Sequence, residues 1–315
     1  VSLHQRSKAR SRAALVTIVF AAAATGHMID RALGTRLGSA LVAPEVLESI
    51  FEAALGSNVV PAVAPSLALA IVAAVGLLSL GVIVRRLLGA GVPVRALGRN
   101  RDKLESLAAL GADTVACDML DRATLDRACA DVSQIVSTAN GIMGSGGGSP
   151  QRVDEPAYVN LISAAAAQGV QRLVYVSARG LTADSIVDFF RIKHRIEGTV
   201  RGSAIPWVIL RPSAFIDVWI DVIMGEGSRR STVATVFGPG TQAGNYIAID
   251  DVAAFVQAIL ADPSVCNEIV DIGGPSEVSL LEFSRLIQRG SNLPEKRRHI
   301  PTAVLAVGRR VVRPF

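Results

Sequence analysis

Residues 92–139 read VPVRALGRNRDKLESLAALGADTVACDMLDRATLDRACADVSQIVSTA. Short runs rich in valine, alanine and leucine alternate in this stretch with longer charged runs that have the spacing of amphipathic helices. We expect strands over 92–97, 114–117 and 134–137, and helices over 101–110 and 123–130. Helices that recur between short apolar strands are typical of a parallel sheet with right-handed crossovers.

The alternation extends in both directions from this stretch. Upstream, Leu69–Ala74 is expected to form the first strand and Gly81–Leu88 the helix that follows it. Downstream, we expect strands over 172–177, 207–210 and 268–272, and helices over 155–168, 188–197, 250–261 and 279–288. Ser279 stands at the N-cap of the last helix, with Glu282 at the capping-box position. The pattern predicts an α/β fold with a Rossmann-like, doubly wound parallel sheet.

Three segments divide the chain. Residues 1–66 are predicted to form an apolar, helical N-terminal extension with a basic start, and residues 67–202 the Rossmann-like domain. Residues 203–315 are expected to complete the sheet and to form a smaller C-terminal substrate lobe. Because the last residues stop in mid-pattern, we expect this segment to be truncated.

Two uncharged runs lie near the N-terminus. Ala13–Ile29 has no formal charge over 17 residues, and Ala53–Val84 has none over 32. About 20 apolar residues are enough for a helix to cross a bilayer, and Arg85 and Arg86 follow the second run as the positive-inside rule expects. Prolines and glycines interrupt that run, so its second half also fits a buried strand, a glycine turn and a helix. Membrane association through 13–29 and 53–84 and a soluble fold both stay open.

The composition excludes some classes of partner. The net charge is +5, but the basic excess gathers at the two ends of the chain, so we expect no nucleic acid. The three cysteines show no CxxC spacing and the four histidines are scattered, which predicts buried reduced thiols and no metal site. The mean hydropathy of +0.42 suits a buried parallel sheet, and it also suits a chain with a membrane segment.

Several short blocks follow one another in an order that is typical of one family. They are Cys117–Asp121, Ser137–Ala139, Val174–Ala178, Arg211–Phe215, Ile249–Ala253 and Gly273–Pro275. With these blocks, the stretch from Leu67 to Gly290 resembles the atypical, extended short-chain dehydrogenase/reductases of the NmrA-like, NAD(P)-binding type. The resemblance implies a dinucleotide-binding domain followed by a lobe that receives the substrate.

The resemblance also implies which residues contact the cofactor. They are Ala73, Gly76, Gly81, Arg99, Asn100, Asp118, Met119, Thr138, Ala139 and Lys193. The first three belong to the phosphate loop, where a glycine lets the backbone approach the phosphates because it has no Cβ. This loop departs from the family pattern, since Ala73 stands at the position of the first glycine and the turn is longer by two residues.

Arg99 ends the second expected strand, where enzymes that prefer NAD(H) carry an acidic residue. An arginine there can hold a 2′-phosphate by bidentate hydrogen bonds, which favours NADP(H), with NAD(H) as the alternative. Asp118 would accept a hydrogen bond from the adenine amine, and Thr138 and Ala139 would line the cofactor with their backbone. A solvated helix N-terminus is the other interpretation of Arg99.

The catalytic centre departs from the short-chain dehydrogenase pattern Tyr-x-x-x-Lys. Lys193 stands where the lysine belongs, but Phe189 occupies the position of the tyrosine that donates a proton. Lys193 and Ser177 are therefore the catalytic candidates that the resemblance implies. His194 could replace the missing acid, but it follows Lys193 on a helix and would point about 100° away, so we interpret it as a surface residue.

Three functions fit these observations. The first is an NADPH-dependent reductase of a small hydrophobic carbonyl or quinone-like substrate. The second is a non-catalytic dinucleotide-binding or scaffold and assembly subunit of a photosynthetic or respiratory membrane complex, which the altered loop and Phe189 would suit. The third, an NmrA-type transcriptional co-regulator, rests on the fold alone. The expected location is a plastid, a mitochondrion or the cytoplasmic side of a bacterial membrane.

Overall fold

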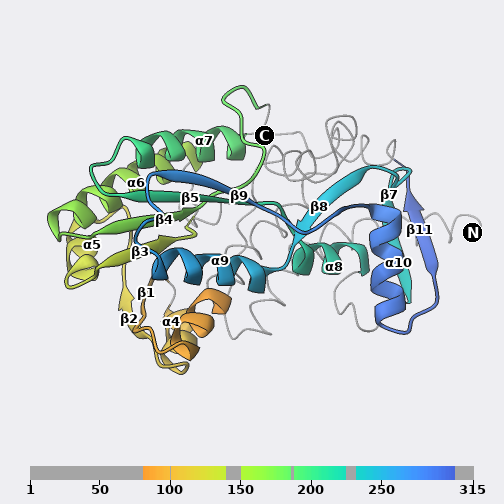
Figure 1. The fold of residues 1–315 in the computed structure, drawn as a ribbon, viewed down its shortest axis with the longest axis horizontal. Coiled ribbons are helices and arrows are strands. Elements are labelled where there is room, and N and C mark those ends of the chain that lie inside the picture. Colours follow the sequence, from red (N-terminus) through yellow and green to blue (C-terminus); the bar gives the residue numbers. More distant parts are fainter. Residues whose placement is uncertain (1–80, 100, 140–149, 186–187, 225–231, 302–315) are drawn as a thin grey trace, which may run out of the picture.

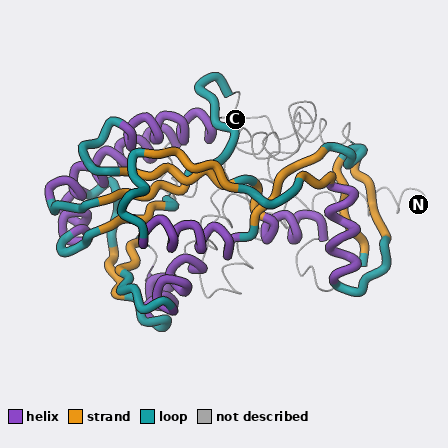
Figure 2. The backbone as a smooth tube through the Cα atoms, viewed as in Figure 1, coloured by secondary structure: helices purple, strands orange, loops and turns teal. Residues whose placement is uncertain are grey.

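The computed structural model describes residues 81–99, 101–139, 150–185, 188–224 and 232–301. Within these residues, a larger α/β body and a smaller lobe follow one another along the long axis of the molecule (Figures 1 and 2). The predicted N-terminal extension and the first expected strand, Leu69–Ala74, lie outside the described residues.

The α/β body contains the strands and helices that the alternating pattern predicts. Its strands are β1 (Arg95–Gly98), β2 (Asp113–Ala116), β3 (Gln134–Ser137), β4 (Arg172–Val176), β5 (Trp207–Pro212) and β9 (Glu268–Ile272). Its helices are α4 (Arg101–Ala108), α5 (Arg122–Cys129), α6 (Pro150–Ala167), α7 (Asp188–Arg201) and α9 (Ile249–Ala261). Residues 81–89 are helical as well, as expected. The main difference in length is α6, which begins five residues before the expected start at residue 155.

The strands of the body pair in parallel throughout. One sheet has the order β3-β4-β5-β9, and β1 and β2 form a second parallel pair. Parallel neighbours need a crossover connection, and α6 supplies it between β3 and β4 while α7 supplies it between β4 and β5. This topology confirms the predicted α/β class.

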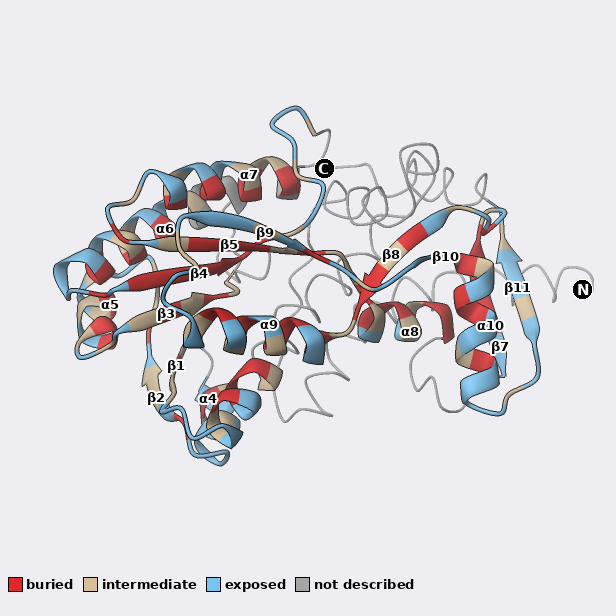
Figure 3. Ribbon diagram, in the orientation of Figure 1, coloured by how far each residue is buried: buried red, intermediate tan, exposed pale blue. Residues whose placement is uncertain are grey.

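Helices cover both faces of the central strands. Alternate residues of a strand point to opposite faces of its sheet. On β4, Leu173 and Tyr175 pack with α5, α6 and α7, whereas Val174 and Val176 pack with α9 and the helix at 81–89. All five residues of β4 are therefore buried (Figure 3). Burial on both faces is what a doubly wound sheet requires, so the prediction of a doubly wound fold is confirmed.

The smaller lobe is built from elements that the sequence pattern mostly did not predict. They are β6 (Ala214–Phe215), α8 (Ile216–Met224), β7 (Val233–Phe237), β8 (Ala243–Ile247), β10 (Glu277–Ser279), α10 (Leu280–Gly290) and β11 (Lys296–Ile300). Its strands pair in the orders β10-β8-β6 and β11-β7. Only α10 was expected, and Ser279 caps it as predicted, because its side chain accepts a hydrogen bond from the backbone N–H of Glu282.

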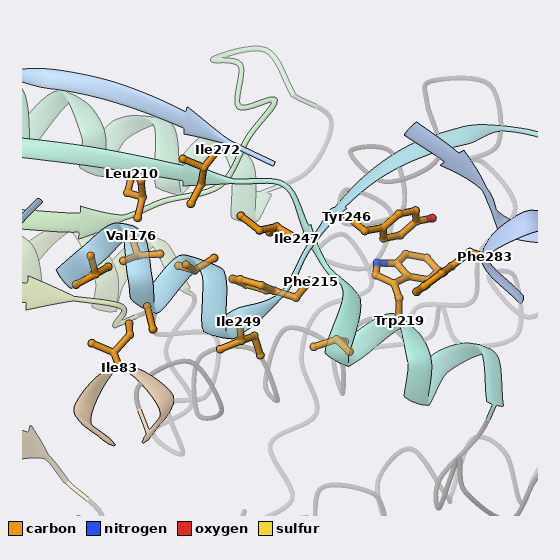
Figure 4. Close-up of a cluster of buried hydrophobic side chains, with 14 of the residues drawn as sticks. Ile83, Val176, Leu210, Phe215, Trp219, Tyr246, Ile247, Ile249, Ile272 and Phe283 are labelled. Atoms are coloured by element: carbon orange, nitrogen blue, oxygen red, sulfur yellow. The ribbon is translucent and has the colours of Figure 1, made fainter. Parts of the chain in front are cut away.

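One apolar cluster runs from the body into the lobe. Figure 4 follows it from Ile83 and Val176 on the sheet side to Trp219, Tyr246 and Phe283 in the lobe. The ring of Tyr246 stacks on Phe283 with centroids 4.6 Å apart and meets the ring of Trp219 edge-on at 6.0 Å. Each large side chain buried here contributes about 2 kcal/mol of hydrophobic free energy, so the two parts stabilise each other.

The helix at 81–89 contains the last four residues of the second uncharged run, 53–84. Gly81 to Val84 close that run, and in the structure Ile83 and Val84 are both buried against the body. Among the described residues, no helix has the length and apolar character that crossing a bilayer requires. The run at 13–29 and the larger part of the run at 53–84 lie outside the described residues.

Candidate functional site

The candidate site lies where β3, β4 and β5 end. In open α/β sheets, ligands bind beyond the carboxyl ends of the parallel strands. Ser137 closes β3, and Ser177 follows the last residue of β4 directly. Helix α7 lies against the same strands, and it carries Lys193 toward them. The structure thus brings Ser177 and Lys193, the two predicted catalytic residues, to one end of the sheet.

Lys193 is held inside the protein rather than on its surface. Only 5% of the residue is exposed, although lysine is among the residues least often buried. Its ammonium Nζ donates a hydrogen bond to the Tyr175 hydroxyl at 3.2 Å and another to the backbone carbonyl of Val176 at 3.3 Å. A buried ammonium group persists only where acceptors compensate its lost hydration, so these contacts fix its position.

Ser177 presents an unsatisfied hydroxyl at the end of β4. Its backbone N–H donates to the carbonyl of Leu210 at 2.7 Å, which fixes the main chain. Its Oγ is buried, yet it has no hydrogen-bond partner among the described residues. An unpaired buried hydroxyl costs about 1–3 kcal/mol, and a ligand oxygen would remove that cost. A ribose or substrate oxygen beside Lys193 would fit this requirement.

The end of β3 is tied to α6 by a tyrosine that the sequence interpretation did not single out. The Tyr158 hydroxyl lies 2.7 Å from Ser137 Oγ and donates to the backbone carbonyl of Ala139 at 2.9 Å. Thr138 and Ala139 were expected to line the cofactor with their backbone, and Tyr158 holds that backbone in place. The Tyr158 ring meets the ring of Tyr175 edge-on, with centroids 5.0 Å apart.

A buried ion pair fastens α7 to β5. Arg211 Nε and Nη2 donate to the two carboxylate oxygens of Glu197 at 2.9 and 2.5 Å. Glu197 is 1% exposed and lies one helical turn after Lys193. The hydrogen bonds to Glu197 raise the pKa of Arg211 above its usual value, against the effect of burial. The pair keeps the helix that carries Lys193 in register with the strand ends.

The expected adenine end of the site is open to solvent. Arg99 follows β1 and Asp118 follows β2, and Arg99 Nη1 lies 4.0 Å from Asp118 Oδ2. Their side chains are 50% and 43% exposed. Asp118 Oδ1 accepts a hydrogen bond from the backbone N–H of Leu120, and the carbonyl of Met119 accepts one from Asn160. The structure therefore brings together the residues expected to bind the 2′-phosphate and the adenine.

The structure does not describe all of the predicted cofactor-binding residues. Ala73, Gly76 and Asn100 lie outside the described residues. Gly81 is the first described residue of its helix, and a Cβ built on it would meet no atom within 4 Å. Phe189 lies in α7 four residues before Lys193, as the sequence pattern placed it.

The described residues include all three cysteines and two of the four histidines, His194 and His299. Among the described residues, no group of three or more histidine, cysteine, aspartate or glutamate side chains could hold a metal ion. Burial raises the pKa of the thiols of Cys117 and Cys129, and that of Cys129 reaches about 11. Both are buried and free, as predicted, whereas Cys266 is free but only partly buried, which differs from the prediction.

The sequence interpretation missed three of the residues that hold the site together. Tyr175 stood inside a quoted block, and strand alternation places it on the same face as Ser177. Glu197 stands four residues after Lys193, so it shares a helix face with it. Tyr158 offered no signal of this kind, because its contact with Ser137 and Ala139 depends on the crossover of α6.

Comparisons with known proteins agree with this geometry. A family model described as NAD(P)H-binding matches residues 81–263. The chain is 29% identical over 208 residues, 65% of its length and 67% of the relative, to (4-alkanoyl-5-oxo-2,5-dihydrofuran-3-yl)methyl phosphate reductase of Streptomyces griseus. It is 26% identical over 212 residues, 67% of its length and 70% of the relative, to an NAD(P)H azoreductase of Xenophilus azovorans.

A solved structure shows the same fold. The triphenylmethane reductase of Citrobacter sp. superposes with a TM-score of 0.55 at 22% identity, over 70% of this chain and 74% of that chain. The family model covers more than half of the chain, from the helix at residue 81 to the end of α9. The resemblance to atypical short-chain dehydrogenase/reductases is thereby confirmed, and the chain belongs to the NAD(P)H-binding family.

Proposed function

We propose that this protein is an NADPH-dependent reductase of a small hydrophobic carbonyl or quinone-like compound. The observation that carries the proposal is the buried pair of Lys193 and Ser177 at the carboxyl ends of the parallel strands. The names of the relatives support the class, because one is named as the reductase of an oxo-dihydrofuranyl methyl phosphate and the other as an azoreductase.

The nicotinamide end of the cofactor fits the buried side of the site. When bound, NADPH supplies a hydride from its nicotinamide ring. Lys193 would donate hydrogen bonds to the hydroxyls of the adjoining ribose and hold the ring beside the end of β4. The unpaired Oγ of Ser177 would donate to the substrate oxygen, where negative charge develops as the hydride arrives. Ser177 is only 6% exposed, so little water would compete with that hydrogen bond.

The preference for NADPH rests on Arg99. Its guanidinium group lies at the end of β1 and is half exposed, so a 2′-phosphate could reach it. Arg99 faces Asp118 at 4.0 Å, a distance at which the ion pair is weak in solvent. A phosphate dianion would therefore compete well for Arg99, whereas the ribose hydroxyl of NADH offers no charge to it.

The phenylalanine at position 189 favours a substrate whose reduction needs no strong proton donor. Without a tyrosine at this position, the reaction must proceed with a weaker acid, and a quinone or enone suits this because its reduced oxygen carries a delocalised charge.

Titration with NADPH and NADH, followed by the nicotinamide fluorescence, tests the cofactor part of the proposal. We expect micromolar binding that favours NADPH. Oxidation of NADPH with quinone and enone acceptors then tests catalysis. Ser177→Ala should lower kcat about 10- to 100-fold and leave the Kd of NADPH within about twofold, because it removes one hydrogen-bond donor to the transition state. No NADPH binding up to millimolar concentration would refute the proposal.

A non-catalytic role in a membrane complex is the second candidate, and the missing tyrosine is the observation that favours it. It predicts NADPH binding without turnover by any acceptor. It also predicts that the full chain stays with the membrane fraction after washing with high salt and carbonate. Release of the chain by that wash, together with turnover of a quinone, would exclude this candidate.

A further inference from the structure

Lys193 contacts a tyrosine, although the tyrosine of the Tyr-x-x-x-Lys pattern is absent. The hydroxyl of Tyr175, on β4 rather than on α7, accepts a hydrogen bond from Lys193 Nζ at 3.2 Å. The same ammonium group lies 4.9 Å from the centre of the Tyr175 ring. We propose that Tyr175 is the positioning residue of Lys193, which sets the direction of its ammonium group toward the nicotinamide ribose. This inference rests on the proposed use of NADPH.

The geometry of the ammonium group explains how Tyr175 could act. Its three N–H bonds point to the corners of a tetrahedron. Two are directed by the Tyr175 hydroxyl and the Val176 carbonyl, and both acceptors belong to β4. With two of these directions fixed by a rigid strand, the direction of the remaining N–H bond is fixed as well. A lysine side chain otherwise has several rotatable bonds and would lose more entropy on binding the ribose.

Tyr175 itself is rigidly held. It is fully buried, and its ring meets the Tyr158 ring edge-on at 5.0 Å. Tyr158 in turn holds the carbonyl of Ala139 through its hydroxyl. A continuous set of contacts therefore leads from the backbone beside the expected cofactor, through two tyrosines, to Lys193. Such a supporting set keeps a functional group within a few tenths of an ångström of its working position.

The location of Tyr175 separates this role from that of the missing tyrosine. A tyrosine four residues before the lysine would stand on α7 and would give its proton to the substrate. Tyr175 is 0% exposed and lies beneath the lysine on the sheet, so it would act on the cofactor only through Lys193. Its loss should weaken the hold on the nicotinamide half of NADPH and leave the adenine half untouched.

Binding of two ligands to the full-length protein tests this inference. NADPH contains both halves of the cofactor, whereas 2′,5′-ADP contains only the half that Arg99 would bind. For Tyr175→Phe we expect the Kd of NADPH to rise about tenfold, as for the loss of a hydrogen bond to a charged group, and the Kd of 2′,5′-ADP to stay within about twofold. A general structural role would weaken both ligands alike, and that result would overturn the inference.

A matched control is available in the smaller lobe. Tyr246 is also buried, and its hydroxyl has no hydrogen-bond partner in the part of the chain that the structure describes. Tyr246→Phe removes the same atom from a similar environment, far along the chain from Lys193. We expect it to leave both dissociation constants unchanged. Equal losses of NADPH affinity in the two variants would count against a specific role for Tyr175.

A double-mutant cycle keeps the test decisive. If Tyr175 acts through Lys193, then Tyr175→Phe should have no effect on the Kd of NADPH in a Lys193→Met background. An unchanged tenfold effect in that background would overturn the inference even though the wild-type protein binds NADPH. If the wild-type protein binds 2′,5′-ADP but gains nothing from the nicotinamide half, Tyr175 has no such role. If it binds neither ligand, the proposed function fails first.

Discussion

The two ends of the candidate cofactor site differ in how they are built. At the nicotinamide end, Lys193 and Glu197 are buried and held by β4 and β5. At the adenine end, Arg99 and Asp118 are about half exposed and face each other across 4.0 Å. Protein contacts fix the side chains at the first end, whereas the side chains at the second end are partly solvated. Changes at the nicotinamide end should therefore affect folding and function together, and changes at the adenine end should affect affinity alone.

The largest effect is expected from breaking the ion pair beneath α7. Arg211→Met would leave the Glu197 carboxylate, which is 1% exposed, without its partner. Removing one member of a buried pair costs about 3 kcal/mol, so the urea midpoint should fall clearly. The double change Arg211→Met with Glu197→Leu should recover most of that loss, because no buried charge remains. If Arg211→Met lowers the unfolding free energy by less than about 1 kcal/mol, the nicotinamide end of the site is less rigid than its burial indicates.

The second effect is a pH dependence of stability, which tests how completely water is excluded from the Cys129 thiol on α5. Burial raises the pKa of the Cys129 thiol from 9.0 to about 11. Between these values the unfolded chain ionises its thiol before the folded chain does, so the stability that Cys129 contributes is complete below pH 9 and falls as the pH rises toward 11. The complete loss should be about 3 kcal/mol, of which about 2 kcal/mol should appear by a pH of about 10.5.

The difference in unfolding free energy between the wild-type protein and Cys129→Ala, measured at pH 8 and at pH 10.5, isolates this contribution. Subtraction removes the titration of lysines and tyrosines elsewhere in the chain. If the difference is the same at both values of pH, the thiol is better hydrated than its burial indicates.

A smaller effect is expected from Arg99→Ala at the exposed end. The Kd of NADPH should rise about 10- to 30-fold, which corresponds to about 1.5–2 kcal/mol, because the partner of the 2′-phosphate is lost. The Kd of NADH should not change, and the unfolding free energy should stay within about 0.5 kcal/mol. Equal losses for both nucleotides would mean that Arg99 is a solvated surface residue, which is the alternative interpretation of the sequence.

The smallest effect is expected from Asp118→Asn. An amide oxygen can still accept the hydrogen bond from the Leu120 N–H, so the local turn should persist. The neutral side chain would no longer compete with phosphate for Arg99, and NADPH should bind about twofold more tightly relative to NADH. The ratio of the two dissociation constants measures this change. A tenfold loss of both affinities would instead indicate that the adenine amine needs the negative carboxylate.

The sequence was most informative where one rule governs many residues. Alternating short strands and helices predicted the sheet of the body, since hydrophobic periodicity and crossover topology act on every residue in it. The positions of Ser177, Lys193 and Phe189 followed from their order along that pattern. The strands β6, β7, β8, β10 and β11 and helix α8 were not predicted, because they lie outside the regular alternation of strands and helices on which the prediction rested.

The interior partners of the site could not be read from the sequence. Arg211 and Tyr158 contact Glu197 and Ala139 only because the crossover helices bring distant segments together. Pattern recognition named Lys193 as a candidate but gave no reason to expect that a strand residue, Tyr175, would hold it. The same limit applies to any single sequence. Periodicity predicts which residues lie on the same face of a helix or strand, but it does not predict which residues of other elements pack against that face.

The interleaving of the two parts has a consequence for the order of synthesis. The chain leaves the body after β5 to form β6 and α8, returns for α9 and β9, and leaves again for β10 and α10. The last described strand, β11, pairs with β7, more than sixty residues earlier in the chain. A ribosome emitting this protein from its N-terminus therefore cannot release a finished sheet in the body before residue 272 emerges, or a finished lobe before residues near 300 emerge. Until β9 and β11 emerge, the edges of β5 and β7 that they cover are the places where chaperones would be needed.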